Sequence, residues 1–408
     1  MEKSMRTVNF RIDITSARLI ACLICITGLL FTDISNAKTM PSIGGVDDTQ
    51  MATENNNPER GGLALTVNNY GIAFGNVPVV HGLRFNLRDI NLNQVNGANI
   101  TILAPREPSY GTVRGLALGL PMTGGASITG VSVALGGITV EESISGIQFA
   151  LLGIGAGTGI SGITVAGLGF GAAGNVSGIN LAGLGLGVDG NLSGITVTGL
   201  GFGSDGNVAG INYATLGFGA GENVSGINIA GLGFGAGGHV TGLSAVLLGF
   251  GAGDDVRGVS FAGLGIGTGG SVTGISVAGL GLASGDAIRG ISLAGIGIAS
   301  GESVCGIAFA GLGIASQQLR GITVSPGAAA MELARGAFFA PAYFRIEDGT
   351  LQGVSVSAFN HILGQQQGIT IGLYNYARNL KGVQIGVMNY AANNPRGLRL
   401  LPLVNANL

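Results

Sequence analysis

The chain has 408 residues, of which 79 are glycine, and its formal net charge is −2 with only 10% charged residues. Ten prolines and the absence of a Gly-X-Y period exclude a collagen-like helix, and a hydrophobic content of 46% excludes a disordered Gly/Ser linker. Because basic residues are scarce and form no stripe, we expect no nucleic-acid partner.

The N-terminus has the pattern of a secretory signal peptide over residues 1–37. Basic residues precede an apolar run, Ile20 to Phe31, which is too short to span a bilayer, and Ser35-Asn36-Ala37 offers small residues for cleavage. We therefore expect an exported protein that is extracellular, at the cell surface, or in the outer membrane or periplasm. Residues 38–61 are polar without periodicity and predict a flexible leader.

A sixteen-residue repeat dominates residues 130–321. Its lead glycine recurs every sixteen residues from Gly130 to Gly306 and once more at Gly321. Residues 62–129 contain shorter, irregular units of the same kind, as expected for the solvent-facing end of an array. A repeat of this length predicts that neighbouring units stack and share one core.

Within the unit that starts at Gly226, the large apolar residues are Ile227, Ile229, Leu232, Phe234 and Val240. Spacings of two residues indicate two short strands, and the glycine-rich segments between the pairs indicate corners that tolerate positive φ. We therefore predict an all-β fold, a β-solenoid of about eighteen stacked coils with two short parallel sheets and degenerate terminal units. All five apolar residues are expected to point inward and to form ladders along the array.

Two sets of small residues are predicted to point outward as candidate interaction faces. The first is a small polar ladder between the first two apolar positions: Thr164, Asn180, Thr196, Asn212, Asn228, Ser244, Ser260 and Ser276. The second is a face of nearly bare backbone: Gly167, Gly169, Gly183, Gly185, Gly231 and Gly233. Because bare backbone permits close approach of another flat surface, self-association or contact with an envelope or extracellular surface is a candidate role for this face.

The rhythm breaks over residues 322–408, where irregular coils and a C-terminal cap are expected. Ala328 to Arg335 could form a helical turn or a distorted coil. Gly368-Ile-Thr-Ile-Gly-Leu-Tyr-Asn375 and Gly382-Val-Gln-Ile-Gly-Val-Met-Asn389 resemble the G-Φ-x-Φ-G-Φ-x-N units of bacterial secreted surface-repeat proteins, where Φ is an apolar residue. The resemblance covers about forty residues and implies export and a surface or envelope location, with no defined reaction.

The sequence contains no pattern that supports catalysis, a metal or a cofactor. Gly169-Phe-Gly171-Ala-Ala-Gly174 matches G-x-G-x-x-G, but it opens no helix and only samples the repeat. The acidic residues at one corner lack the period of a calcium-binding β-roll, and the three histidines are far apart in the sequence. We expect a protein that is not an enzyme.

The interpretation favoured by these patterns is a secreted or cell-envelope repeat protein with a structural, surface-binding or adhesion-like role. One alternative is an outer-membrane β-barrel in which each unit is a strand and a turn and neighbouring strands are antiparallel, which the mean hydropathy of +0.51 would suit. A further alternative is binding to ice or another crystal surface through the small polar ladder.

Overall fold

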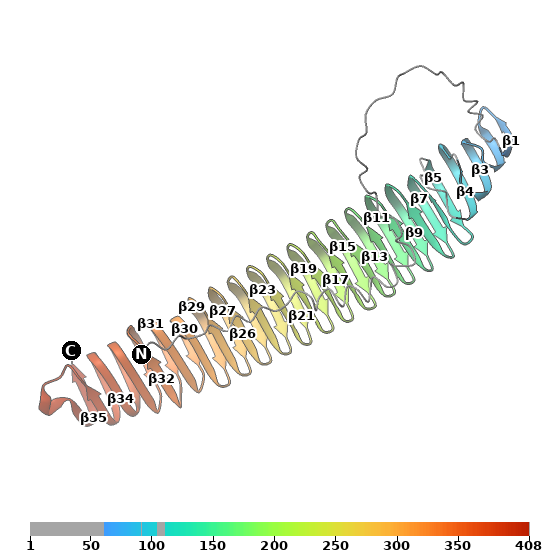
Figure 1. The fold of residues 1–408 in the computed structure, drawn as a ribbon. Coiled ribbons are helices and arrows are strands. Elements are labelled where there is room, and N and C mark those ends of the chain that lie inside the picture. Colours follow the sequence, from blue (N-terminus) through green and yellow to red (C-terminus); the bar gives the residue numbers. More distant parts are fainter. Residues whose placement is uncertain (1–60, 91, 104–110, 408) are drawn as a thin grey trace, which may run out of the picture. The chain divides into compact units, whose positions relative to one another are not determined.

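The computed structural model describes residues 61–90, 92–103 and 111–407. The predicted signal peptide and the predicted leader, except Gly61, lie outside these residues. Glu59–Leu408 forms one compact unit. It is an all-β solenoid of about 18 stacked coils with a spacing of about sixteen residues, which confirms the predicted fold class (Figure 1).

Each regular coil contributes one longer and one shorter strand. The longer strands are β7 (Ser127–Ala134), β9 (Ser143–Ala150), β11 (Gly159–Ala166), β13 (Val176–Ala182), β15 (Leu192–Thr198), β17 (Val208–Ala214), β19 (Val224–Ala230), β21 (Val240–Val246), β23 (Val256–Ala262), β25 (Val272–Ala278), β27 (Ala287–Ala294) and β29 (Ser303–Ala310). The shorter strands are β8 (Gly137–Val140), β10 (Gly153–Ala156), β12 (Gly169–Ala172), β14 (Gly185–Val188), β16 (Gly201–Ser204), β18 (Gly217–Ala220), β20 (Gly233–Ala236), β22 (Gly249–Ala252), β24 (Gly265–Thr268), β26 (Gly281–Ser284) and β28 (Gly297–Ser300).

The two kinds of strand build two parallel ladders. β19 pairs with β17 and β21, whereas β20 pairs with β18 and β22, and every partner is displaced by one repeat, as in Asn212↔Asn228↔Ser244. Equivalent residues therefore lie in columns along the solenoid. This parallel register is the predicted one and differs from the alternating antiparallel strands that the alternative interpretation required.

Antiparallel strands occur at both ends of the described solenoid. At the N-terminal end, β1 (Gly62–Val67) pairs antiparallel with β2 (Tyr70–Gly75). The turn between them uses Asn68 and Asn69 at φ of 51° and 67°, a conformation that asparagine tolerates. The irregular coils then continue through β3 (Val79–Arg88), β4 (Gln94–Leu103), β5 (Thr112–Gly119) and β6 (Thr123–Gly125).

At the C-terminal end, β35 (Leu400–Asn407) pairs antiparallel with β34 (Phe359–Ala391) after the short 3-10 helix η1 (Arg396–Leu398). The other strands of this region are β30 (Gly313–Val324), β31 (Gly327–Phe339), β32 (Tyr343–Ile346) and β33 (Thr350–Val356). Of the two options for Ala328 to Arg335, the distorted coil is correct, because these residues belong to β31.

The core contains only two of the five predicted inward ladders. Phe234 and Val240 are buried, but Ile227, Ile229 and Leu232 are 41%, 39% and 48% exposed, so their predicted inward orientation is wrong. Along β19 the buried positions are Val224, Asn228 and Ala230. Because strand residues alternate between the two faces, burial of this set places the two isoleucines outside.

The phenylalanine column shows how neighbouring coils complete the core. Phe202, Phe218, Phe234 and Phe250 stack with ring centroids 4.5 to 4.7 Å apart. This spacing matches the separation of hydrogen-bonded strands, about 4.8 Å, so the backbone ladder sets the stacking distance. No single coil encloses such a core without its neighbours.

Positive φ angles occur at the lead glycines, not at the corner glycines where we predicted them. From Gly130 to Gly321 the lead glycines have φ between 102° and 128°. A Cβ atom on Gly226 would lie 2.1 Å from the carbonyl oxygen of Gly210. Both the backbone conformation and the neighbouring coil therefore require glycine at the first position of the repeat.

Candidate interaction surface

Three columns of large apolar side chains lie on the surface of the array, two on the longer strands and one in the turn that follows them, and we call them the aliphatic face. They occupy the second, fourth and seventh positions of the repeat. In the eleven coils that begin at Gly146 to Gly306, these positions contain no Asp, Glu, Lys or Arg. The second-position column is Ile147, Ile163, Ile179, Ile195, Ile211, Ile227, Leu243, Val259, Ile275, Ile291 and Ile307.

The fourth-position column differs from the second in side-chain size. It is Phe149, Val165, Leu181, Val197, Tyr213, Ile229, Ala245, Phe261, Val277, Leu293 and Phe309. The seventh position carries leucine in ten of these eleven coils and Ile296 in the remaining one. Exposed apolar residues scattered singly are ordinary, whereas continuous apolar surfaces are typical of interaction sites in other proteins.

A polar column borders this face immediately before the lead glycines. Its N-terminal half is hydroxyl-rich, with Ser145, Ser161, Ser177, Ser193, Ala209, Ser225 and Thr241. Its C-terminal half contains Arg257, Thr273, Arg289, Cys305, Arg320 and Arg335, of which the four arginines are exposed. The border of the aliphatic face is thus neutral along one half of the array and basic along the other.

The small polar ladder that we predicted on the surface is inside the solenoid. The eight residues are at most 2% exposed, and they are Thr164, Asn180, Thr196, Asn212, Asn228, Ser244, Ser260 and Ser276. They alternate with the exposed apolar residues along each longer strand, so one side chain of each pair must be internal. The prediction of a polar outer face is wrong, and the ice-binding alternative that rested on it is not retained.

Hydrogen bonds between neighbouring coils satisfy part of this buried column. The Gln148 side-chain amide donates to Thr164 Oγ1 at 3.0 Å, and Asn212 Nδ2 donates to Asn228 Oδ1 at 2.9 Å. Pairing in the interior is what makes burial of a polar side chain tolerable. The column is structural in the described coils and presents no polar groups to a partner.

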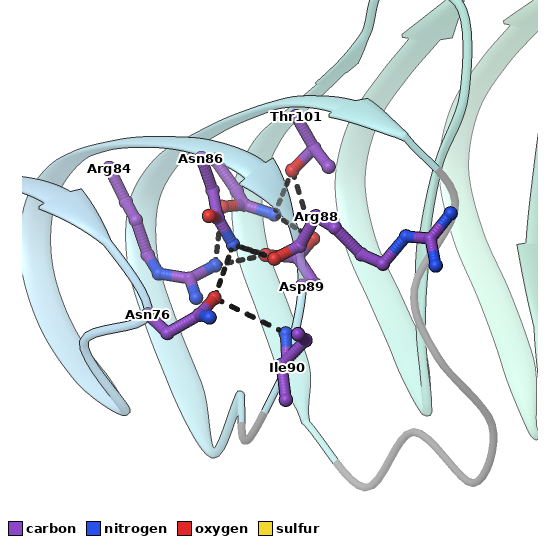
Figure 2. A network of polar contacts seen from close by, with 8 residues as sticks. Asn76, Arg84, Asn86, Arg88, Asp89, Ile90 and Thr101 are labelled. Atoms are coloured by element: carbon purple, nitrogen blue, oxygen red, sulfur yellow. Dashed lines mark hydrogen bonds and ion pairs between the residues drawn. The ribbon is translucent and has the colours of Figure 1, made fainter. Parts of the chain in front are cut away.

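At the N-terminal end the same column contains a charged residue, Arg84 (Figure 2). Arg84 and Asp89 are both buried and form an ion pair. The Asp89 carboxylate also accepts hydrogen bonds from Asn99 Nδ2 and Thr101 Oγ1, each at 2.9 Å, and from Asn86 Nδ2 at 3.0 Å. Because the carboxylate is surrounded by donors from its own chain, we assign the cluster to stabilisation of the N-terminal coils.

The six glycines predicted to keep a surface bare have reasons within the fold. A Cβ atom on Gly167, Gly183 or Gly231 would lie 1.7 to 2.0 Å from a carbonyl oxygen of the preceding coil. A Cβ atom on Gly169, Gly185 or Gly233 would lie 2.1 to 2.6 Å from a carbonyl oxygen of the following coil. Close stacking of coils explains these glycines without an external partner.

The tenth position of the repeat is different, because its glycines have open space beside them. A Cβ atom on Gly187, Gly203, Gly219 or Gly235 would meet no atom within 4 Å. Further along the same side, a shallow groove of about 760 Å³ runs from Gly265 to Tyr343 between the glycine and alanine columns. A stripe of small residues defines no ligand by itself, but these positions can accept substitutions with little effect on the fold.

Asparagines at one corner of the coil form a second ladder. The Oδ1 atoms of Asn175 and Asn191 each accept a hydrogen bond at 2.8 Å from the backbone N–H one repeat later, in Asn191 and Asn207 respectively. The corner acids Asp189 and Asp205 are exposed beside this ladder. The corner asparagines therefore tie neighbouring coils together through their side-chain oxygens.

His239 and Asp255 continue the corner ladder. The backbone N–H of Ser271 donates to Asp255 Oδ1 at 2.8 Å, and Arg257 Nη2 lies 2.6 Å from Asp255 Oδ2. The pKa of Asp255 is lowered chiefly by that backbone hydrogen bond, against a smaller opposing effect of burial, with further lowering by the charges of Arg257 and His239. His239 lies 3.7 and 3.8 Å from Asp255 and Asp254, in a corner that is open to solvent.

The asparagines of the C-terminal G-Φ-x-Φ-G-Φ-x-N units are buried and linked. Asn360 Nδ2 donates to Asn375 Oδ1, and Asn375 Nδ2 donates to Asn389 Oδ1, each at 2.7 Å. The asparagine of this motif therefore joins successive coils through the core. Beside it, burial and then the charge of Arg345 lower the pKa of His361, whereas burial is the main cause of the raised pKa of Tyr374.

Comparison with known proteins assigns the chain to no family. The comparisons find no matching family model, no similar curated protein and no similar solved structure. In the described part of the chain, no helix is long and apolar enough to cross a membrane. The same residues contain no group of three or more His, Cys, Asp or Glu side chains arranged to hold a metal ion. The aliphatic face is consequently the feature on which a functional proposal can rest.

Proposed function

We propose that the chain is a non-enzymatic repeat protein of the bacterial cell surface or envelope, exported by its N-terminal signal, whose role is structural or interactive. The observation that carries the proposal is the aliphatic face, an uncharged surface of three apolar columns over eleven coils. A solvent-exposed apolar surface of this size is unfavourable for an isolated protein and becomes favourable when a partner covers it.

The N-terminal sequence and the C-terminal units that resemble secreted surface-repeat proteins support export. The fold supports an interaction role because stacking repeats multiplies one weak contact many times along a rigid support. The interior is filled by Phe, Ile, Leu, Val, Ala and small polar side chains, and the aliphatic face is apolar except for the phenol hydroxyl of Tyr213.

Cell fractionation tests this proposal. The full chain, expressed with its N-terminal segment in a Gram-negative host, is expected to lose residues before about Lys38 and to fractionate with the envelope. The double variant Ile211→Lys/Ile227→Lys should be exported equally but released from the envelope, because charge replaces two adjacent members of the apolar column. The matched control Gly203→Ser/Gly219→Ser alters open surface positions and should behave as wild type.

Uncleaved protein in the cytoplasm would contradict export. Equal envelope retention of the wild type and the lysine variant would contradict a role for the aliphatic face.

A further inference from the structure

We propose that the aliphatic face is covered by the same face of a second copy, with the two solenoids antiparallel and related by a twofold axis through the coil of Gly226. The inference rests on the proposed interaction role and names its partner. In this arrangement each column opposes its own counterpart, as required for an isologous interface.

The repeat period favours a second copy over other occupants. Strand hydrogen bonding fixes the coil spacing at about 4.8 Å in both copies, so side-chain columns remain in register along the whole contact. Eleven coils give a length of about 53 Å, and a strip about 12 Å wide then buries about 600 Å² per copy, or about 1,200 Å² in total, which reaches the size of a specific interface.

Side-chain sizes complement one another when the array is paired about Gly226. The opposed fourth-position pairs are then Tyr213 with Ala245, Val197 with Phe261, Leu181 with Val277, Val165 with Leu293 and, at the two ends of the contact, Phe149 with Phe309. The first four pairs join a larger and a smaller side chain, which is how two apolar surfaces interdigitate without voids, whereas the end pair joins two phenylalanines. At the centre, Ile229 meets Ile229 of the second copy.

The polar border has the same complementarity. The antiparallel arrangement brings Arg257 opposite Ser193 and Arg289 opposite Ser161, so arginines of one copy lie against serines of the other. The N-terminal half of the border carries no charge from Ser145 to Thr241, so like charges do not oppose one another within the eleven coils, and the only opposed pair of arginines in this column, Arg114 with Arg335, lies two coils beyond them. A parallel twofold arrangement would reverse the order of the columns and bring each coil against the same coil of the second copy, so both correspondences would be lost.

Association of the full chain, purified as the cell produces it, tests the proposal by analytical ultracentrifugation from 1 to 200 µM. The wild type should form a dimer. Ile229→Asp should weaken association at least a hundredfold, since it places two carboxylates at the axis. Because Ile229 is 39% exposed, the variant should keep the wild-type circular dichroism spectrum.

A gain-of-affinity variant separates this geometry from other modes of association. Ser193→Asp should strengthen the dimer severalfold by placing a carboxylate opposite Arg257, whereas the matched variant Ser177→Asp, opposite Thr273, should not. Ser145→Cys should crosslink through a short bismaleimide to the native Cys305 of the second copy. Within one chain these positions are ten coils, or about 48 Å, apart.

A wild type that stays monomeric at 200 µM overturns the proposal, and so does a monomer that binds vesicles of phosphatidylglycerol and phosphatidylethanolamine through this face. Loss of association in Gly219→Asp with no effect of Ile229→Asp would assign the contact to the glycine side and would also overturn it. Each result leaves the export and envelope retention of the proposed function intact, so the two proposals fail separately.

Discussion

Replacement of two glycines in the same coil by alanine should have opposite consequences. Gly226 begins the coil at φ 102°, and a Cβ atom there would lie 2.1 Å from Gly210 O and 2.9 Å from Gly210 C. Gly235, nine residues later, has a φ outside the left-handed region and no atom within 4 Å of an added Cβ. The two variants add the same methyl group to a β-strand of one repeat.

The expected magnitudes follow from these surroundings. An alanine at positive φ costs about 1–2 kcal/mol, and the contact with a backbone carbonyl must be relieved by displacement of a neighbouring coil. We therefore expect Gly226→Ala to lower the free energy of unfolding by at least about 3 kcal/mol. Gly235→Ala restricts the unfolded chain without strain and should raise it by about 0.4–1 kcal/mol.

Chemical denaturation followed by circular dichroism compares the two variants. Because repeat arrays can unfold in parts, hydrogen exchange in β17, β19 and β21 should accompany the midpoint measurement. Gly226→Ala should accelerate exchange in these strands, whereas Gly235→Ala should not. Similar shifts in the two variants would refute the argument that the lead glycine is required by the coil-to-coil contact.

The remaining predictions concern the core, the corner ladder and acid stability. Phe234→Ala should lower the free energy of unfolding by about 3–5 kcal/mol, because it removes a buried ring from a stack. Ile227→Ala should lower the free energy of unfolding of the monomer by less than about 1 kcal/mol. Equal losses of stability in the two denaturation curves would contradict the assigned orientation of these side chains. Asn191→Ala should lower the free energy of unfolding by about 1–2 kcal/mol, because the backbone N–H of Asn207 loses its acceptor. The control variant Asp189→Ala should leave the free energy of unfolding nearly unchanged in the same denaturation assay. Comparable losses of stability in the two variants would argue against the asparagine ladder. Asp255 has a lowered folded-state pKa, so its stabilising contribution is present above the unfolded value of 3.8 and is lost as the pH falls through the folded pKa. Asp255→Asn keeps an acceptor for Ser271 and should lose less stability than the wild type between pH 5 and 2, by up to about 1 kcal/mol; coincident pH profiles would exclude this role.

The architecture could be predicted because it follows from the period alone. Lead glycines at a constant spacing place equivalent residues in columns, whether the side chains of those residues point inward or outward. Pairs of apolar residues two positions apart indicate strands. Phe234 and Val240 were correctly assigned to the core. The resemblance of the C-terminal units to secreted repeat proteins remains a prediction, since no comparison bears on it.

The orientation of the longer strand could not be read from its apolar residues. In Ile227-Asn228-Ile229-Ala230 both faces alternate regularly, and hydrophobicity favours burying the isoleucines. The buried residues are every second residue of the strand, counted from Val224 to Ala230, and both of these side chains are small enough for the interior. The polar residues at these positions can pair with the equivalent residue one coil away. A lone buried asparagine would be unfavourable, but the column pairs Asn212 with Asn228, while both polar side-chain atoms of Asn180 remain without a hydrogen-bond partner.

The limited volume of the interior explains why the solenoid buries the face of the longer strand that carries the smaller side chains. The shorter strand contributes a phenylalanine, leucine or isoleucine to each regular coil, and the longer strand supplies one Val, Leu or Ile, a small polar residue and usually an Ala to the same interior. A second layer of isoleucines would overfill that space and push the two sheets apart. Because these isoleucines are excluded from the core, many apolar side chains remain on the surface. The backbone ladders hold the coils together without them. Those residues are unnecessary for closing the core, so their nearly unbroken columns are better explained by a partner than by the stability of a single chain.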